Sequence, residues 1–150
     1  MEFELNDRLK QLNSMLCEID SLYQALLSAK NISDSEFVVI NAILSLGESC
    51  LQKDIAETSY MSKKTINSTI KKLEKEGYLK LKAGKYPNMH IYLTPRGIEH
   101  IKNHIFPIID VEERVLDSMS EDEFERLIVS SSKYIGIFKE HVANFIIRER

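Results

Sequence analysis

Residues 52–79 read QKDIAETSYMSKKTINSTIKKLEKEGYL, and this stretch decides the fold. It holds a short amphipathic segment at 52–58 and then a longer one that begins after Ser62. The apolar positions of the longer segment are Ile66, Ile70 and Leu73. Their spacings of four and three residues predict two helices joined by a short turn. Ser62 is a candidate N-cap of the second helix, and Gly77, directly after Glu76, is a candidate stop.

The periodicity changes from helical to alternating after Gly77. Residues 78–82 and 89–93 flank a turn over 83–88, which predicts a β-hairpin. Two helices joined by a turn and followed by a hairpin form the winged helix-turn-helix arrangement. In that arrangement the second helix can lie in the major groove of DNA.

Two helices are expected before this lobe. The first carries an apolar stripe with heptad-like spacing. Its members are Leu5, Leu9, Leu12, Leu16, Ile19, Tyr23 and Leu26. The second is expected to start at a capping box formed by Ser33 and Glu36, and to stop at Gly47.

Two more helices are expected after the hairpin. Thr94 followed by Pro95 predicts the start of a long helix, and Pro107 predicts a kink within it. Ser120 and Glu123 form a second candidate capping box for the last helix. The apolar positions of that helix include Phe138, Val142 and Phe145. The predicted fold class is therefore mainly α with a small β-hairpin wing, a winged helix-turn-helix flanked by long helices.

Charge is distributed unevenly along the chain, whose net charge is −3. Residues 51–94 contain nine lysines and four acidic residues, a local charge of +5, while the flanks together carry −8. A basic segment between acidic flanks is typical of local contact with a polyanion. A solvated lysine-rich helix is the simpler explanation of the charge alone.

The residue types needed for DNA contact occur on the second helix and on the hairpin. Asn67 can form a bidentate contact with adenine, and Thr65 and Ser68 are short enough to approach base edges. Ser62 with the free amides of the helix N-terminus suits a phosphate. The predicted DNA-binding residues are Lys53, Ser62, Lys63, Lys64, Thr65, Asn67, Ser68, Lys71, Lys82, Lys85 and His90. The alternative is a winged helix that binds a protein partner without binding DNA.

Four motifs together resemble the MarR family of winged helix-turn-helix transcriptional regulators. They are QKDIAE at 52–57, MSKKTIN at 61–67, KLEKEGYL at 72–79 and IYLTPRG at 91–97. The resemblance implies a homodimer on a palindromic DNA site, often governed by a small-molecule effector or a redox signal. It assigns a DNA-binding lobe to residues 33–94 and dimerisation helices to 1–30 and 95–150, within one domain over 1–150. The predicted dimerisation residues are Leu5, Leu9, Leu12, Leu16, Ile19, Phe138, Val142 and Phe145.

The sequence departs from the family pattern at two places. The family's wing usually carries an Asp-x-Arg motif, whereas residues 85–90 here read KYPNMH. Contact of lysine or histidine with the DNA backbone replaces readout by arginine in this prediction. Ser59 and Tyr60 stand where a Leu-Gly turn is common, so the turn between the two helices is expected to pack differently.

Other functions are less well supported by the sequence. No nucleophile–histidine signature or glycine-rich phosphate loop indicates an enzyme, and no cofactor is predicted. His100 and His104 have a spacing that can hold zinc, but a solvated or interface pair is the favoured interpretation. Cys17 has acidic neighbours, which favours a packed, inert thiol over a redox sensor. No apolar run suggests a membrane span, so a cytoplasmic protein is expected.

Overall fold

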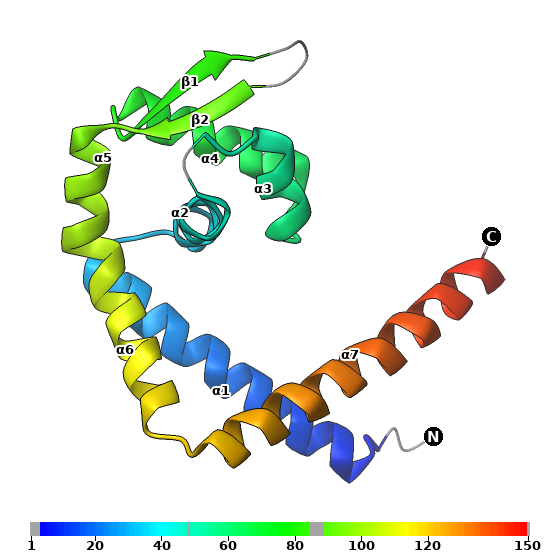
Figure 1. The fold of residues 1–150 in the computed structure, drawn as a ribbon. Helices are drawn as coiled ribbons and strands as arrows, with labels where there is room; N and C mark the ends of the chain where they lie inside the picture. The colour runs from blue at the N-terminus through cyan, green and yellow to red at the C-terminus, as the bar shows by residue number, and fades with distance from the viewer. Residues whose placement is uncertain (1–3, 48, 85–88, 150) are drawn as a thin grey trace. The chain divides into compact units, whose positions relative to one another are not determined.

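A computed structural model describes residues 4–47, 49–84 and 89–149. The described residues divide into two compact units, with the boundary between Ile108 and Ile109. Figure 1 shows the elements in chain order. They are α1 (Asp7–Lys30), α2 (Asp34–Leu46), α3 (Gln52–Thr58), α4 (Lys63–Lys75), β1 (Leu79–Ala83), β2 (Met89–Leu93), α5 (Pro95–His100), the π-helical turn η1 (Ile101–Ile105), α6 (Phe106–Asp117) and α7 (Glu121–Arg148). The predicted fold class, mainly α with a hairpin wing, is confirmed. The prediction of one domain over the whole chain stays a prediction.

The ends of α4 are set by the residues that the sequence indicates. The Ser62 hydroxyl accepts the backbone N–H of Thr65, which satisfies one of the free amides of the first turn. At the other end Gly77 has φ +79°, a left-handed conformation that glycine adopts without steric cost. These two signals limit α4 to thirteen residues between the turn and the hairpin.

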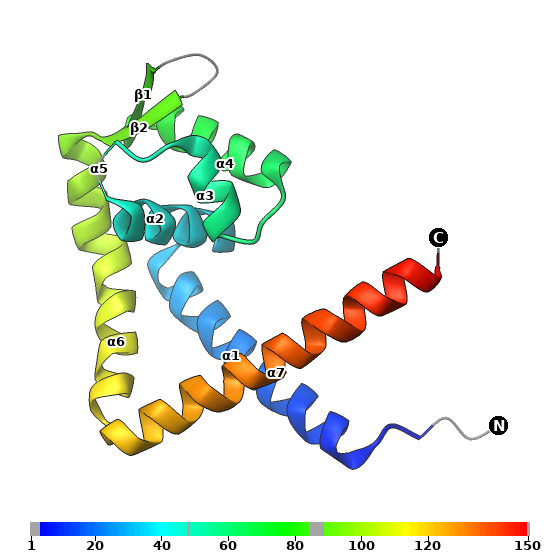
Figure 2. The ribbon, with the colours of Figure 1, turned by 45° about the vertical axis from the view of Figure 1, so that its right-hand side comes forward.

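α2 runs through the middle of the lobe, where it contacts α1, α3 and α4 (Figures 1 and 2). Its sequence is apolar on most sides, as expected for a helix enclosed by others. The largest side chains that are almost fully buried come from α2 and from elements on either side of it in the sequence: Ile40, Ile55, Ile66, Ile70, Leu73, Leu79, Ile91, Ile105 and Ile108. The three that belong to α4, Ile66, Ile70 and Leu73, lie on the side that anchors this helix in the core, and α2 is one of the helices it contacts.

The capping box predicted at Ser33 and Glu36 is only half formed. The Ser33 hydroxyl accepts the backbone N–H of Glu36, so Ser33 caps α2 as predicted. The Glu36 carboxylate is buried and instead binds Lys72 and His100, on other elements. A glutamate three residues after the N-cap is expected in a capping box, and here the same position supplies a buried ion pair. The local sequence pattern therefore cannot distinguish these two roles of Glu36.

The wing is a two-stranded antiparallel sheet in which Leu81 pairs with Ile91 and Lys82 pairs with His90. The first strand begins one residue later than the alternation predicts. Gly97 in α5 lies against the backbone at the start of β1, since a Cβ on Gly97 would meet the Tyr78 carbonyl oxygen at 2.0 Å. The glycine of the LTPRG motif therefore permits α5 to pack directly behind the wing.

Pro107 is accommodated by a change in helix geometry. The Phe106 N–H bonds to the Ile101 carbonyl, five residues back, and this forms the π-helical turn η1 just before the proline. Because proline has no N–H, the Asn103 carbonyl lacks its usual helical donor. The Lys30 ammonium, at the end of α1, donates to that carbonyl at 3.5 Å.

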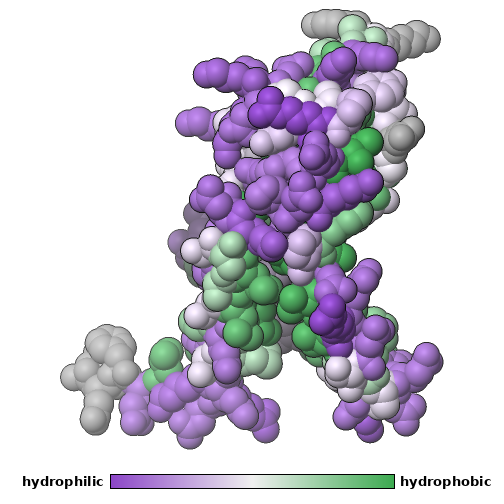
Figure 3. Space-filling view, turned by 90° about the vertical axis from the view of Figure 1, so that its left-hand side faces the viewer, coloured by the Kyte–Doolittle hydropathy of each residue, from purple (hydrophilic) through white to green (hydrophobic). Residues whose placement is uncertain are grey.

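The long flanking helices expose most of their apolar side chains. α1 begins after Asn6, so Leu5 lies outside the helix that its spacing predicts. Leu9, Leu16 and Ile19 are 42–49% exposed. In α7 no residue is buried. Figure 3 shows apolar side chains at the surface outside the winged lobe. None of the helices in the described part of the chain is both long and apolar enough to span a membrane.

Candidate nucleic-acid interface

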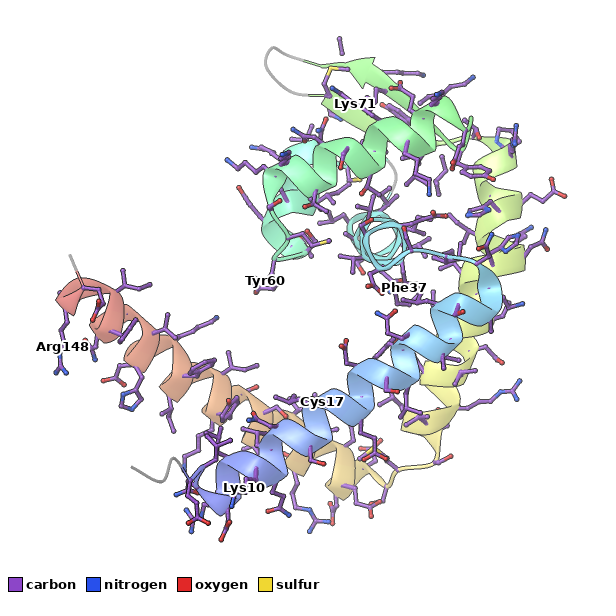
Figure 4. The ribbon with its side chains drawn as sticks, turned by 180° about the vertical axis from the view of Figure 1, so that it is seen from behind. Lys10, Cys17, Phe37, Tyr60, Lys71 and Arg148 are labelled. Carbon is purple, nitrogen blue, oxygen red and sulfur yellow. The ribbon has the colours of Figure 1, made fainter. Side chains whose placement is uncertain are left out.

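α4 has two chemically distinct faces. Ile66, Ile70 and Leu73 have no exposed surface, whereas polar side chains occupy the other side. The exposed members are Lys63, Lys64, Asn67, Ser68 and Lys71, and Thr65 is half-buried. Figure 4 marks Lys71 on α4, and Figure 3 shows a largely hydrophilic surface over the lobe. The helix thus presents lysines and short polar groups to its surroundings while its apolar side is anchored in the core.

The hydroxyl groups at the start of α4 are engaged within the helix. Ser62 and Thr65 share a hydrogen bond of 2.7 Å between their hydroxyls, and the Ser68 hydroxyl donates to the Thr65 carbonyl at 2.9 Å. These bonds stabilise the first turn. An approaching phosphate would therefore meet the N-terminal end of the helix and the ammonium of Lys63.

Asn67 lies beside a residue that the sequence analysis did not single out. Gln52 Nε2, at the start of α3, donates a hydrogen bond to Asn67 Oδ1. The two amides line a hollow of about 290 Å³. Its lining residues are Leu51, Gln52, Lys53, Ala56, Lys63, Asn67 and Met89. Three predicted DNA-binding residues, Lys53, Lys63 and Asn67, are therefore brought together. The only sequence signal for Gln52 is its place at the head of the QKDIAE motif.

Lys72 differs from the other lysines of α4. Its Nζ lies 3.2 Å from the buried Glu36 Oε2, and Glu36 Oε1 lies 2.8 Å from His100 Nε2. The hydrogen bond to Glu36 raises the pKa of Lys72 above its ordinary value, because the bond stabilises the ammonium form. Lys72 is exposed, as expected for the outward face of α4, but its ammonium is held by Glu36 of α2, which also bonds to His100 at the end of α5.

The predicted DNA-binding residues of the wing differ in exposure. Lys82 is exposed, and its ammonium lies 4.7 Å from the centre of the Tyr92 ring. His90 is half-buried, with Nδ1 2.8 Å from the Ser49 carbonyl oxygen. Lys85 lies outside the described residues. Contact of these three side chains with DNA stays a prediction.

The histidine pair is part of the protein's internal structure. The His100 ring stacks on Tyr78, with 4.1 Å between ring centres, and on His104, with 4.8 Å. His104 Nδ1 lies 3.2 Å from the Lys30 carbonyl oxygen. Of the favoured interpretation, a solvated or interface pair, the solvated form does not hold because both rings are half-buried, and the interface form stays a prediction. Among the described residues, no three histidine, cysteine or acidic side chains cluster in a way that suits a metal ion.

The two cysteines lie in different environments. Cys17 is exposed on α1 (Figure 4), so the expectation of a packed thiol is wrong for the single chain. Cys50 is buried, and loss of solvent raises the pKa of its thiol.

The fold and the surface of α4 define a winged-helix protein. Residues 30–85 match the sequence model of the MarR family, so the resemblance to that family is confirmed over the helix-turn-helix and the start of the wing. No curated protein matches the chain.

Solved structures of MarR family regulators share the fold over most of the chain. NMB1585, a MarR family regulator from Neisseria meningitidis, superposes with a TM-score of 0.80 at 17% identity, covering 93% of this chain and 99% of that one. MepR from S. aureus, in a complex with DNA, gives 0.68 at 16% identity, covering 90% and 99%. PcaV from Streptomyces coelicolor, bound to its natural ligand, gives 0.68 at 14% identity, covering 89% and 97%.

Proposed function

We propose that this protein is a transcriptional regulator that binds double-stranded DNA in a sequence-specific manner and is not an enzyme. The observation that carries the proposal is the exposed face of α4, where lysines surround Asn67 opposite a fully buried apolar face. Lysines supply the charge that displaces counterions from DNA, and an asparagine amide can discriminate one base from another. A cytoplasmic location is part of this proposal.

The proposed active form is a homodimer in which each protomer places α4 in a major groove. A two-fold dimer binds a palindromic site whose half-sites lie about one helical turn, roughly 34 Å, apart. The exposed apolar side chains of α1 and α7 support dimerisation, because such surfaces usually mark an interface. Repression by blocking polymerase is the proposed output.

Relatives of the same fold motivate two further parts of the proposal. MepR has been crystallised with DNA and PcaV with its natural ligand. By analogy, we propose that a small-molecule effector weakens DNA binding by this protein and so relieves repression. The chemical class of that effector is left open, as is the operator sequence.

Selection of bound duplexes from a random-sequence pool tests the proposal. The wild-type protein is expected to enrich a palindrome, and Asn67→Ala is expected to relax one position in each half-site at a cost of about 1–3 kcal/mol. A pool that stays random after selection by the wild-type protein would contradict sequence-specific binding. An unchanged palindrome with Asn67→Ala would contradict the assignment of Asn67 to base readout.

A further inference from the structure

The amide of Asn67 is held by a residue from another helix. Gln52 is the first residue of α3, and its Nε2 donates to Asn67 Oδ1 on α4, fifteen residues later in the chain. Asn67 is exposed and Gln52 is half-buried, so the bond forms at the surface, at the hollow that Lys53 and Lys63 also line. This bond joins the two helices of the helix-turn-helix on the side that bears the proposed DNA-binding residues.

The bond leaves the Asn67 amide able to read a base. A carbonyl oxygen has two lone pairs, so Oδ1 can accept one hydrogen bond from Gln52 and a second from a base. Asn67 Nδ2 makes no hydrogen bond with any residue in the described part of the chain. An asparagine contacts adenine by donating to N7 and accepting from N6, which needs both ends of the amide. Gln52 therefore occupies only one of the available positions of the Asn67 amide.

We propose that Gln52 is a positioning residue for base recognition, which holds the Asn67 amide in the orientation that bonds to adenine. This inference rests on the proposed function. Without Gln52, an exposed asparagine rotates among several conformers and must be ordered when DNA binds. Ordering a mobile side chain at an interface costs about 0.5–1.5 kcal/mol, which corresponds to roughly two- to twelvefold in affinity. Gln52 orders Asn67 before DNA binds, so this cost is not incurred on binding. The gain in affinity appears only on DNA sequences that carry the base to which Asn67 bonds.

The experiment compares four proteins on duplexes that differ only at the base pair read by Asn67: wild type, Gln52→Met, Asn67→Ala and the double variant. Methionine keeps the length of Gln52 and loses its amide. We expect Gln52→Met to reduce discrimination at that base pair by about two- to twelvefold. We expect no further effect of Gln52→Met when Asn67 is already alanine. Thermal denaturation establishes that each variant is folded.

Lys53→Met provides the matched control, since Lys53 is the next residue of α3 and lines the same hollow. It is expected to weaken binding to all duplexes equally and to do so with or without Asn67. Discrimination that is unchanged in Gln52→Met, or a Gln52→Met effect of the same size in the Asn67→Ala background, would overturn the inference and leave the proposed function standing. Absence of any DNA binding by the wild-type protein would overturn both.

A measurement on the free protein tests the bond itself. Gln11 is an exposed glutamine on α1 and serves as the reference. In a spectrum of side-chain amides, the Gln52 protons are expected to exchange with water more slowly than those of Gln11, and Asn67→Ala should remove the difference. Equal exchange rates for the two glutamines in the wild-type protein would overturn the inference without any use of DNA.

Discussion

Gly97 shows how one missing side chain fixes the position of α5 behind the wing. A Cβ at this position would lie 2.0 Å from the Tyr78 carbonyl oxygen, and the neighbouring atoms are backbone. We therefore predict that Gly97→Ala lowers the free energy of unfolding by about 1–3 kcal/mol, the usual cost of forcing atoms into a packed site. Chemical denaturation measures this cost.

Gly136→Ala is the control for that prediction. Gly136 lies within α7, and an added Cβ meets nothing within 4 Å. Because alanine favours helix over glycine by about 0.5–1 kcal/mol, this change should be neutral or stabilising. A stable Gly97→Ala protein would mean that the contact between α5 and the start of β1 is not rigid.

Tyr60 is a residue in an unfavourable conformation. It lies in the turn before α4, has φ +55° and is 89% exposed (Figure 4), so little packing compensates for the strain. The left-handed region costs a residue with a Cβ about 1–2 kcal/mol. We predict that Tyr60→Gly raises the free energy of unfolding by up to about 1 kcal/mol, since the unfolded chain also gains freedom.

Tyr60→Ala separates the strain from the loss of the ring. Alanine keeps the Cβ and removes the exposed aromatic group, so it should give no comparable gain in thermal denaturation. Equal stabilisation by glycine and alanine would show that the tyrosine ring, and not the backbone, is responsible.

At the level of helices, Glu36 connects three elements. Its carboxylate is 4% exposed and binds Lys72 on α4 and His100 on α5. We predict that Glu36→Gln lowers the free energy of unfolding by about 1–3 kcal/mol, because an amide replaces the buried, charged acceptor that Lys72 and His100 share. Thermal denaturation at neutral pH measures the change.

Asp7→Asn is a suitable control for Glu36→Gln. Asp7 forms an ion pair with Lys10, but its side chain is 96% exposed, and exposed pairs add little to stability. Equal effects of the two substitutions would indicate that Glu36 acts as an ordinary surface charge and does not hold α4 in place.

The sequence predicts where helices and strands begin and end when a capping residue or a glycine marks the boundary. The bounds of α3 and β2 agree with prediction, and α4 follows from Ser62 and Gly77. The two partners of Glu36, Lys72 and His100, and the bond between Gln52 and Asn67 could not be predicted, since each contact joins residues on different helices. The π-helical turn was also missed, because Pro107 signals a disturbed helix without specifying how the backbone adjusts.

The exposed apolar side chains of α1 and α7 are the candidate contacts between protomers in the proposed dimer. Leu16 and Ile19 on α1, and Phe138 and Phe145 on α7, are each between 45% and 63% exposed. Burying such side chains in a second protomer would contribute about 25 cal/mol for each Å² removed from water. We predict that the combined substitutions Leu12→Glu and Leu16→Glu convert a dimer into monomers, as measured by sedimentation velocity.

Ser14→Glu and Ser21→Glu place the same added charge on α1, away from the apolar stripe, and should leave the dimer intact. A dimer that survives Leu12→Glu and Leu16→Glu with unchanged affinity would contradict the assignment of this stripe to the interface. Cys17 is exposed on the same helix and is unchanged in all of these variants.

The central claim is that lysines on the exposed side of α4 contact DNA phosphates, and the salt dependence of DNA binding tests it most directly. For the wild-type protein, the logarithm of the association constant should fall linearly with the logarithm of salt concentration, with a slope of several units. Lys71→Ala, acting in both protomers, should reduce that slope by about 2, while Lys133→Ala on α7 should leave it unchanged. A slope near zero for the wild-type protein, or an identical slope for Lys71→Ala, would contradict the claim and favour a winged helix that binds a protein.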